Sequence, residues 1–152
     1  MISGLAQGFI PTRNYGSRDG KKICKITPHH MSAHWTAKRC AEFFQNETTS
    51  ASANYCIGYN GEIICSVEEE NRAWTSSNRT NDGYAITIEC ANSKTSEDWP
   101  ISDKTWNSLV ELCVDICTRY GFRLEYDGTP NGSLTAHRMF AQTDCPRRLY
   151  VY

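Results

Sequence analysis

The sequence predicts an α/β protein with a central mixed β-sheet flanked by helices. Three observations predict this class. Short β-prone runs alternate apolar and polar residues, Asn60-Gly61 separates two such runs, and residues 102–120 repeat apolar side chains three and four apart. Strands and helices in this mixed order are typical of a sheet with helices packed on it. We expect residues 1–152 to form a single domain, since 152 residues is an ordinary domain size.

The first third of the chain should contain one strand and one helix. Residues 1–20 hold Gly, Pro, Asn and Ser with little periodicity and should form an irregular arm. Residues 21–27 alternate, and the strand they predict should end before Pro28, which cannot donate a ladder hydrogen bond. Residues 36–47 predict a short amphipathic helix, since one face carries Ala37, Cys40, Ala41 and Phe44.

The rest of the chain predicts a hairpin, two strands and a long helix. Residues 54–67 form the hairpin around Asn60-Gly61, which is the strongest short hairpin signal. Residues 84–91 predict a strand with Thr87 and Glu89 on one face. The helix over 102–120 begins at a Ser102 cap and ends at Gly121. Residues 122–126 suggest a last strand, and loops should dominate from Gly128 onward.

Charge and composition exclude several classes of partner. The formal net charge is −1, so nothing attracts the chain broadly to nucleic acid or anionic membranes. No apolar run approaches the ~20 residues that cross a bilayer, and residues 1–20 do not resemble a secretory signal. The eight cysteines are therefore expected to be thiols made in a reducing compartment. The sequence contains no C-x-x-C pair, which argues against a finger-type structural zinc site.

Histidine and cysteine residues suggest a metal site. Of the four histidines, His29, His30 and His34 follow the first predicted strand, while His137 lies eight residues before Cys145. A catalytic zinc site usually has three protein ligands and one open position. One early histidine together with His137 and Cys145 would supply those three ligands. Taken alone, any one histidine is more often structural.

Four motifs, in order over residues 22–146, resemble one family. "ITPHHMSAHWTA" resembles the I-x-x-H-H-T/S segment of the zinc N-acetylmuramoyl-L-alanine amidases, a family shared by small phage lysozymes and peptidoglycan-recognition proteins. "TAHRMFAQTDCP" is similar to its closing H-R-x(5)-[K/T]-x-C-P motif. "ITIECANS" and "NYCIGYNGEI" resemble a strand and a hairpin of phage endolysin amidases. The resemblance implies an amidase/peptidoglycan-recognition-protein-like domain.

The resemblance implies one Zn²⁺ per chain, bound by His29, His137 and Cys145. In the family the first histidine of the H-H pair is the ligand, so His30 is expected to be structural or to lie behind the ligands. His34 remains an alternative to His29. Asp144 remains an alternative to Cys145, because some relatives use aspartate near this place.

The resemblance also implies catalytic roles. Glu89 is the candidate general base, which would take a proton from water and pass it to the leaving amine; the alternative is a solvated glutamate on an edge strand. Thr143 is the candidate oxyanion donor, although a loop threonine bonded to the backbone is equally compatible. The peptide of the substrate could contact Trp74, Asn81 and Asn92.

Two departures from the family pattern stand out. Many relatives have a tyrosine near the metal where this chain has Ala53, and neither Tyr55 nor Tyr59 fills that register. The absence favours the Glu-dependent branch of the family. "CPRRLYVY" replaces the usual C-P-G and leaves the path of the chain after Cys145 open.

The function implied is zinc-dependent hydrolysis of the amide between N-acetylmuramic acid and L-alanine in bacterial peptidoglycan. The expected setting is a phage or prophage endolysin that is made in the host cytoplasm and acts on the cell wall after release. A C-terminal wall-binding domain could be missing from this chain. The alternatives are a non-catalytic peptidoglycan-binding module of the same fold and a structural-zinc interaction domain.

Overall fold

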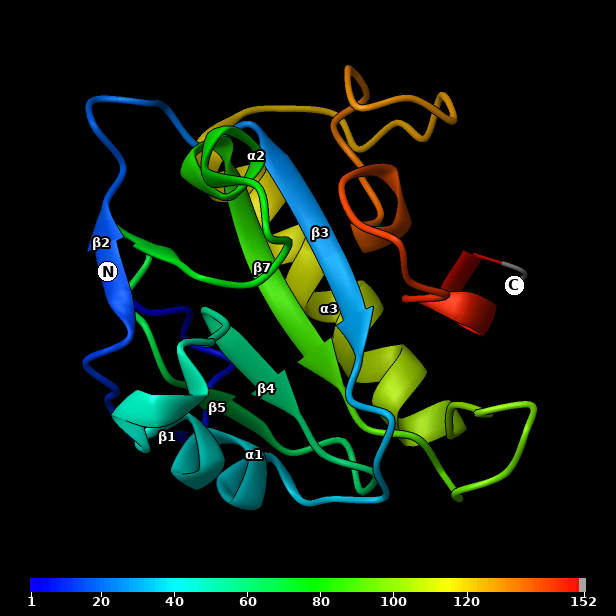
Figure 1. The fold of residues 1–152 in the computed structure, drawn as a ribbon. Coiled ribbons are helices and arrows are strands. Elements are labelled where there is room, and N and C mark those ends of the chain that lie inside the picture. Colours follow the sequence, from blue (N-terminus) through cyan, green and yellow to red (C-terminus); the bar gives the residue numbers. More distant parts are fainter. Residues whose placement is uncertain (151–152) are drawn as a thin grey trace.

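A five-stranded mixed sheet forms the centre of the fold (Figure 1). The structure is a computed structural model that describes residues 1–150, with only the backbone of Tyr150. The strand order is β1-β5-β4-β7-β3; β4 and β5 are antiparallel and the other pairs are parallel. The α/β prediction is therefore confirmed. The five strands are β1 (Gly8–Phe9), β3 (Lys25–His30), β4 (Tyr55–Ile57), β5 (Ile63–Cys65) and β7 (Ala85–Cys90).

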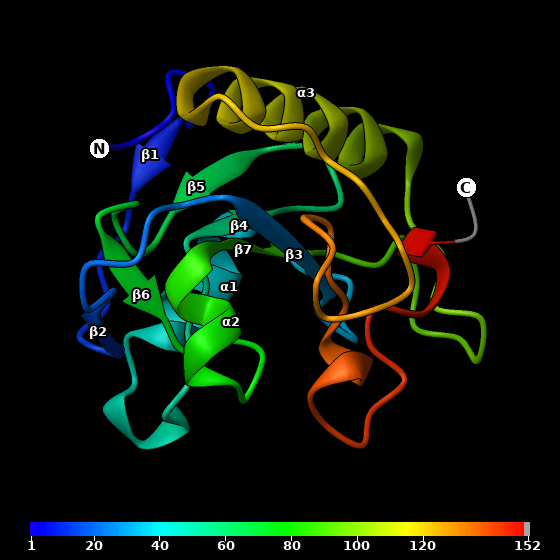
Figure 2. The same ribbon diagram turned by 90° about the horizontal axis from the view of Figure 1, so that it is seen from above.

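Helices cover both faces of the sheet (Figure 2). Helix α3 (Asp103–Tyr120) lies on one face, while α1 (Ala37–Phe44) and α2 (Arg79–Tyr84) lie on the other. Each face has its own apolar core. Ile86 and Ile88 of β7 pack toward α3, so the alternation along β7 turns Thr87 and Glu89 to the opposite face. Strand β7 thus delivers polar side chains to the face that α3 does not cover.

The elements with strong local signals form as predicted. Helix α3 begins at Ser102, whose hydroxyl accepts a hydrogen bond from Thr105 N at 3.1 Å, and ends at Gly121 with φ +70°. The hairpin β4–β5 turns at Asn60-Gly61. Helix α1 is capped by Thr36 and buries the predicted apolar face, which consists of Ala37, Cys40, Ala41 and Phe44.

The prediction that the first strand ends before Pro28 is wrong. Strand β3 continues to His30, with Pro28 opposite Ile88. Because β3 is the outer strand of the sheet, the nitrogen of every second residue faces away from β7. Ile26 uses this outward side to donate to Ser133 O at 2.8 Å. Pro28 has the same orientation two residues later, so no ladder bond is lost.

Two further expectations need correction. Residues 1–20 are largely irregular but contribute the short strands β1 and β2 (Tyr15–Ser17), and β2 pairs with β6 (Asn71–Ala73). Residues 122–126 form no strand. Their apolar side chains Phe122 and Leu124 pack against the α3 core, and an isolated bridge, Ile26 to Leu134, extends the sheet on that side. The alternation in this segment therefore reflects packing rather than a ladder.

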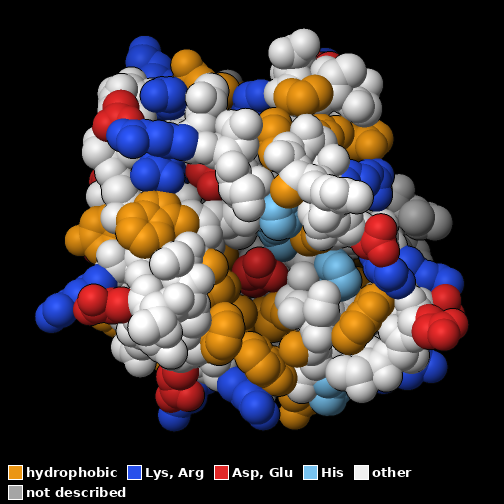
Figure 3. Space-filling model, viewed as in Figure 1, with side chains coloured by type: hydrophobic (Ala, Val, Ile, Leu, Met, Phe, Trp, Pro, Cys, Tyr) orange, Lys and Arg blue, Asp and Glu red, His pale blue; other side chains and the backbone are white. Residues whose placement is uncertain are grey.

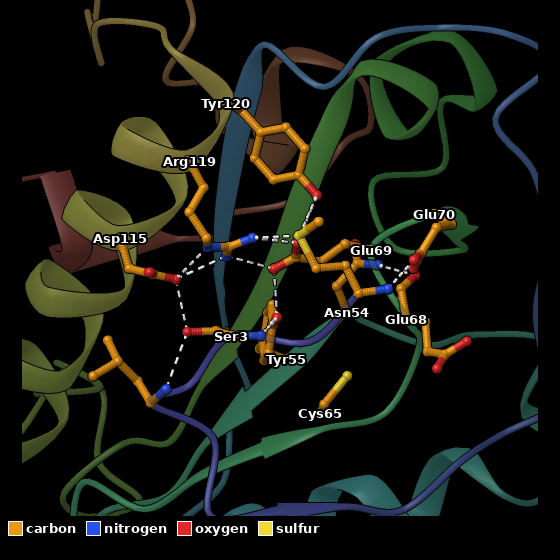
Figure 4. A network of polar contacts seen from close by, with 12 residues as sticks. Ser3, Asn54, Tyr55, Cys65, Glu68, Glu69, Glu70, Asp115, Arg119 and Tyr120 are labelled. Carbon is orange, nitrogen blue, oxygen red and sulfur yellow. Dashed lines mark hydrogen bonds and ion pairs between the residues drawn. The ribbon is translucent and has the colours of Figure 1, made fainter.

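A buried polar network connects α3 to β4 and to the loop that follows β5 (Figure 4). The carboxylate of Glu69, which has no solvent exposure, accepts hydrogen bonds from Tyr55 Oη at 2.5 Å and Tyr120 Oη at 2.6 Å. Both Arg119 terminal nitrogens also donate to it, at 2.6 and 2.7 Å.

Within residues 1–150, no helix has the length and apolar character needed to cross a membrane.

Breaking this network should cost substantial stability. We expect Arg119→Met to lower the free energy of unfolding by about 3 kcal/mol, because it leaves the Glu69 carboxylate buried without its cation. Urea unfolding measures the loss. Arg123→Met is the control: its ion pair with Glu125 is exposed and 3.8 Å long, and should contribute about 1 kcal/mol or less. Equal losses in the two variants would contradict the assignment of the buried pair.

Candidate metal centre

Three potential metal ligands converge beside the carboxyl end of β3. They are His29 of β3, His137 at the start of a 3₁₀ turn (His137–Met139) and Cys145 in the following loop. One ligand atom from each lies within 4.8 Å of the other two. Cys145 Sγ is 3.5 Å from His29 Nδ1, and the two imidazole centroids are 4.8 Å apart. Residues separated by more than a hundred positions thus meet at one point.

Backbone hydrogen bonds bring the late segment to β3. Ser133 O accepts from Ile26 N, and Thr135 N donates to Ile26 O at 3.1 Å, so residues 133–135 run beside the outer strand. His137 follows two residues later and therefore lies near His29. Arg138 N then donates to Cys145 O at 3.0 Å, which closes the loop and returns Cys145 to the histidines.

Burial keeps both imidazoles neutral. It lowers the pKa of His29 well below its usual value, and the neighbouring His137 lowers it further. Burial also lowers the pKa of His137. Neutral imidazole is the form that binds metals. The pKa of the Cys145 thiol is raised to about 12, first by burial and then by the Glu89 carboxylate, so a metal must displace its proton.

The donor set fits zinc. With Zn–N of ~2.0–2.1 Å and Zn–S of ~2.3 Å, nitrogen and sulfur ligands of a tetrahedral ion lie roughly 3.5 Å apart, which matches the Cys145–His29 separation. His29 presents Nδ1 to the Cys145 sulfur, and Nε2 of His137 is buried without a hydrogen-bond partner among the described residues. Over residues 1–150, the group that could hold a metal contains these three side chains only. Three protein ligands are typical of a catalytic rather than a structural zinc site.

The alternative ligands lie elsewhere. The His34 ring stacks on Tyr59 at 4.1 Å, and its Nδ1 is 3.0 Å from Asn92 O. The His30 ring lies edge-on to Trp99. Asp144 forms an ion pair with Arg147 at 2.6 Å, and its side chain is 73% exposed. The structure therefore groups Cys145, and not Asp144, with the histidines.

Glu89 lies beside the cluster on β7. It is opposite His29 in the register of β3 and β7, and opposite Cys56 on the other side. β7 is an interior strand, so Glu89 is not on an edge. Its Oε2 is buried and has no partner among residues 1–150. Burial raises the pKa of Glu89 to about 8, which is close to the operating range of a general acid–base group.

Thr143 lies in the loop that carries Cys145. Its hydroxyl accepts a hydrogen bond from Cys145 N at 3.2 Å. The backbone-bonded arrangement considered for this threonine is therefore present. Because the oxygen acts here as an acceptor, its own proton can still be donated to another group.

The three residues suggested for peptide binding lie outside the three-ligand cluster. Trp74 follows β6, and its main chain bonds to Ser52. Asn92 is fully buried, and its amide joins two loops by accepting from Ala33 N and donating to Trp99 O at 2.9 Å. Asn81 of α2 is only 4% exposed, and both ends of its amide bond to side chains inside the protein.

The cluster opens onto the face that α3 leaves uncovered. Figure 3 shows histidine side chains and a recessed acidic side chain around a hollow on this face. A separate hollow of about 430 Å³, lined by apolar side chains of α3, includes none of the ligands. Three buried threonines were missed by the sequence analysis, although each precedes Glu89 or a histidine of the cluster by two positions: Thr27, Thr87 and Thr135.

Several solved structures share this fold. The catalytic domain of XlyA superposes with a TM-score of 0.72 at 19% identity, covering 97% of this chain and 92% of that one. PlyL gives 0.68 at 19% identity, covering 86% and 77%. LysCS of Clostridium intestinale, described as an endolysin N-acetylmuramoyl-L-alanine amidase, gives 0.66 at 16% identity, covering 95% and 90%. At these identities the likeness establishes the fold.

The sequence itself establishes the family. Residues 19–148 match the family profile described as N-acetylmuramoyl-L-alanine amidase. This chain therefore belongs to the N-acetylmuramoyl-L-alanine amidase family. No curated protein matches the chain.

Proposed function

We propose that the protein hydrolyses the amide between the lactyl group of N-acetylmuramic acid and L-alanine in peptidoglycan, and that it uses one zinc ion. The observation that carries the proposal is the convergence of His29, His137 and Cys145, with Glu89 on the neighbouring strand, in a chain of this family. Family membership supplies the substrate class, and the cluster supplies a place for the metal.

Bound zinc would polarise the scissile carbonyl and lower the pKa of the attacking water to about 7. The protein supplies the proton transfers. Glu89 accepts a proton from the attacking water and passes it to the departing L-alanine amine. Burial raises its pKa to about 8 in the metal-free protein, and the positive charge of a bound zinc would lower that pKa toward neutrality, where the carboxyl can hold or release a proton.

Thr143 is proposed to donate a hydrogen bond from its hydroxyl to the oxyanion of the tetrahedral intermediate. The Cys145 N–H bond holds the threonine oxygen in place and leaves that proton available. We expect Thr143→Val to lower kcat by about 10- to 100-fold. Loss of a single oxyanion donor typically lowers kcat by ~10²–10³, and the effect should be smaller here because zinc would share the charge of the oxyanion. Thr143→Ser should retain most of the activity. Similar kcat values for the valine and serine variants would remove Thr143 from the mechanism.

Two features disfavour the alternatives. A structural zinc domain would need a fourth protein ligand, and the group within residues 1–150 has three. A non-catalytic peptidoglycan-binding module would have no use for the cysteine ligand, whereas Cys145 is buried against His29. Both features favour hydrolysis.

The proposed setting is a phage or prophage endolysin, made in the host cytoplasm and released to the wall. The fold likeness to endolysin amidases supports it. Cells expressing the chain in their cytoplasm should lyse only after their membrane is permeabilised. Lysis without permeabilisation would contradict this setting.

Digestion of purified peptidoglycan tests the activity. The parent protein should release new L-alanine amino ends, a chelator should stop the release, and added Zn²⁺ should restore it. Sugar reducing ends should not increase, which separates amidase from glycosidase cleavage. A zinc-loaded parent that releases no amino ends would overturn the proposal and favour a binding module.

A further inference from the structure

We propose that Asn81 is a positioning residue that sets the spacing of the two histidines of the metal centre through Thr27 and Thr135. The inference rests on the proposed metal site and adds residues that touch neither metal nor substrate. It assigns a purpose to a buried polar triangle, two members of which lie close to the two histidines in the chain.

Each histidine of the cluster has a threonine two positions before it. Thr27 precedes His29 along β3, where residues two apart share a face of the sheet. Thr135 precedes His137 through Ala136, whose φ of −120° and ψ of 144° are also extended. A single residue in extended conformation therefore separates each threonine from its histidine, so the positions of the two are coupled.

Three hydrogen bonds close a triangle between these threonines and Asn81. Asn81 Nδ2 donates to Thr27 Oγ1 at 3.0 Å, Thr135 Oγ1 donates to Asn81 Oδ1 at 3.1 Å, and the two threonine oxygens are 2.8 Å apart. The amide oxygen can only accept, so the single hydroxyl proton of Thr135 is used there. Thr27 must then donate to Thr135, and every polar atom of the triangle has a partner.

The triangle is rigid because it is dry and anchored. Both threonines have no solvent exposure, and Asn81 has 4%. A buried group that loses its partner here finds no water, so the closed arrangement is strongly preferred. Helix α2 holds the third corner, since Asn81 N donates to the Asn78 side chain at 2.9 Å.

The consequence falls on the metal centre. Metal sites need their ligands within roughly 0.5 Å of the productive geometry. Main-chain hydrogen bonds to Ile26 also hold the 133–135 segment to β3. Opening the triangle would let His137 move relative to His29. Changes of residues that orient metal ligands typically weaken metal affinity by about 10- to 100-fold.

The test compares zinc affinity among folded variants. Thr135→Val keeps the side-chain shape but removes the hydroxyl from the triangle, Thr135→Ser keeps the hydroxyl, and Asn81→Ala opens the triangle from α2. Asn14→Ala is the matched control: Asn14 is 3% exposed and bonds to Phe44 O and Asn46 O, away from the cluster. Chelator competition gives the Zn²⁺ affinity, and the absorption spectrum of bound Co²⁺ reports the ligand geometry.

We expect Thr135→Val and Asn81→Ala to bind Zn²⁺ about 10- to 100-fold more weakly than the parent, with altered Co²⁺ spectra. Thr135→Ser and Asn14→Ala should match the parent. Parental affinity in folded Thr135→Val would overturn the inference and leave the proposed function standing. If that variant does not fold, Asn81→Ala decides by the same criterion. A parent that binds no zinc would overturn both the inference and the proposed function.

Discussion

Glu89→Gln should abolish amide hydrolysis and, in the metal-free protein, increase the free energy of unfolding. Loss of activity follows because glutamine cannot carry the proton from water to the leaving amine. The gain in stability follows from the site: the carboxyl of Glu89 is held in a buried position where its Oε2 has no partner among residues 1–150. A neutral amide of the same shape avoids the cost of burying the charge.

The raised pKa of Glu89 gives the sign and the pH window. Burial raises it to about 8, from the ordinary value of 4.5. The folded protein therefore holds this proton more tightly than the unfolded chain, and stability falls as the pH rises from about 4.5 to about 8. At about 1.4 kcal/mol per pH unit, the penalty that Glu89→Gln removes is at most about 3.5 kcal/mol at pH 7. Urea unfolding with a chelator present, at pH 5 and pH 7, measures it.

Glu69→Gln is the matched control, since both glutamates are enclosed by protein and their pKa values shift in opposite directions. Burial alone would raise the pKa of Glu69, but hydrogen bonds from Arg119, Tyr120 and Tyr55 lower it overall. Glu69→Gln should therefore destabilise the protein at pH 7 and leave zinc binding unchanged. If Glu89→Gln were also destabilising, or retained hydrolysis, Glu89 would be a structural residue.

Cys145→Ser should remove both zinc binding and activity. The serine hydroxyl does not ionise at neutral pH, so it cannot replace the thiolate as a charged ligand. Changing a residue that only orients a metal ligand lowers activity by about 10- to 100-fold, and the loss in Cys145→Ser should be larger than that. Zinc content after dialysis and the release of amino ends from peptidoglycan are the two measurements.

Cys113→Ser is the control for Cys145→Ser. Cys113 is a partly buried thiol of α3 that packs against the apolar core, so its variant should lose some stability and keep one zinc per chain. Retention of stoichiometric zinc and of activity by Cys145→Ser would show that the metal, if used, is bound elsewhere.

Elements with local signals were predictable, and those fixed by distant partners were not. Ser102 and Gly121 bound α3, and Asn60-Gly61 defines the hairpin, because caps and turns depend on adjacent residues. The path of β3 through Pro28 depended on its place at the sheet edge, and the sheet order is not encoded locally. The short strands β1, β2 and β6 likewise depend on partners more than forty residues away.

The site divides in the same way. The resemblance named His29, His137 and Cys145, and the structure places these three together. The burial of Asn81 was not predictable from the sequence, because the hydrogen-bond partners of its amide come from β3 and from the segment before His137. The spacing of Thr27 and Thr135 from the histidines was visible in the sequence, but its meaning required the contact between the two segments.

Zinc content combined with zinc-edge X-ray absorption of the purified protein tests the central claim most directly. We predict one zinc per chain, with two nitrogen ligands, one sulfur ligand at ~2.3 Å and one further light ligand from solvent. Absence of zinc after zinc-supplemented expression, or a shell without sulfur, would contradict the account.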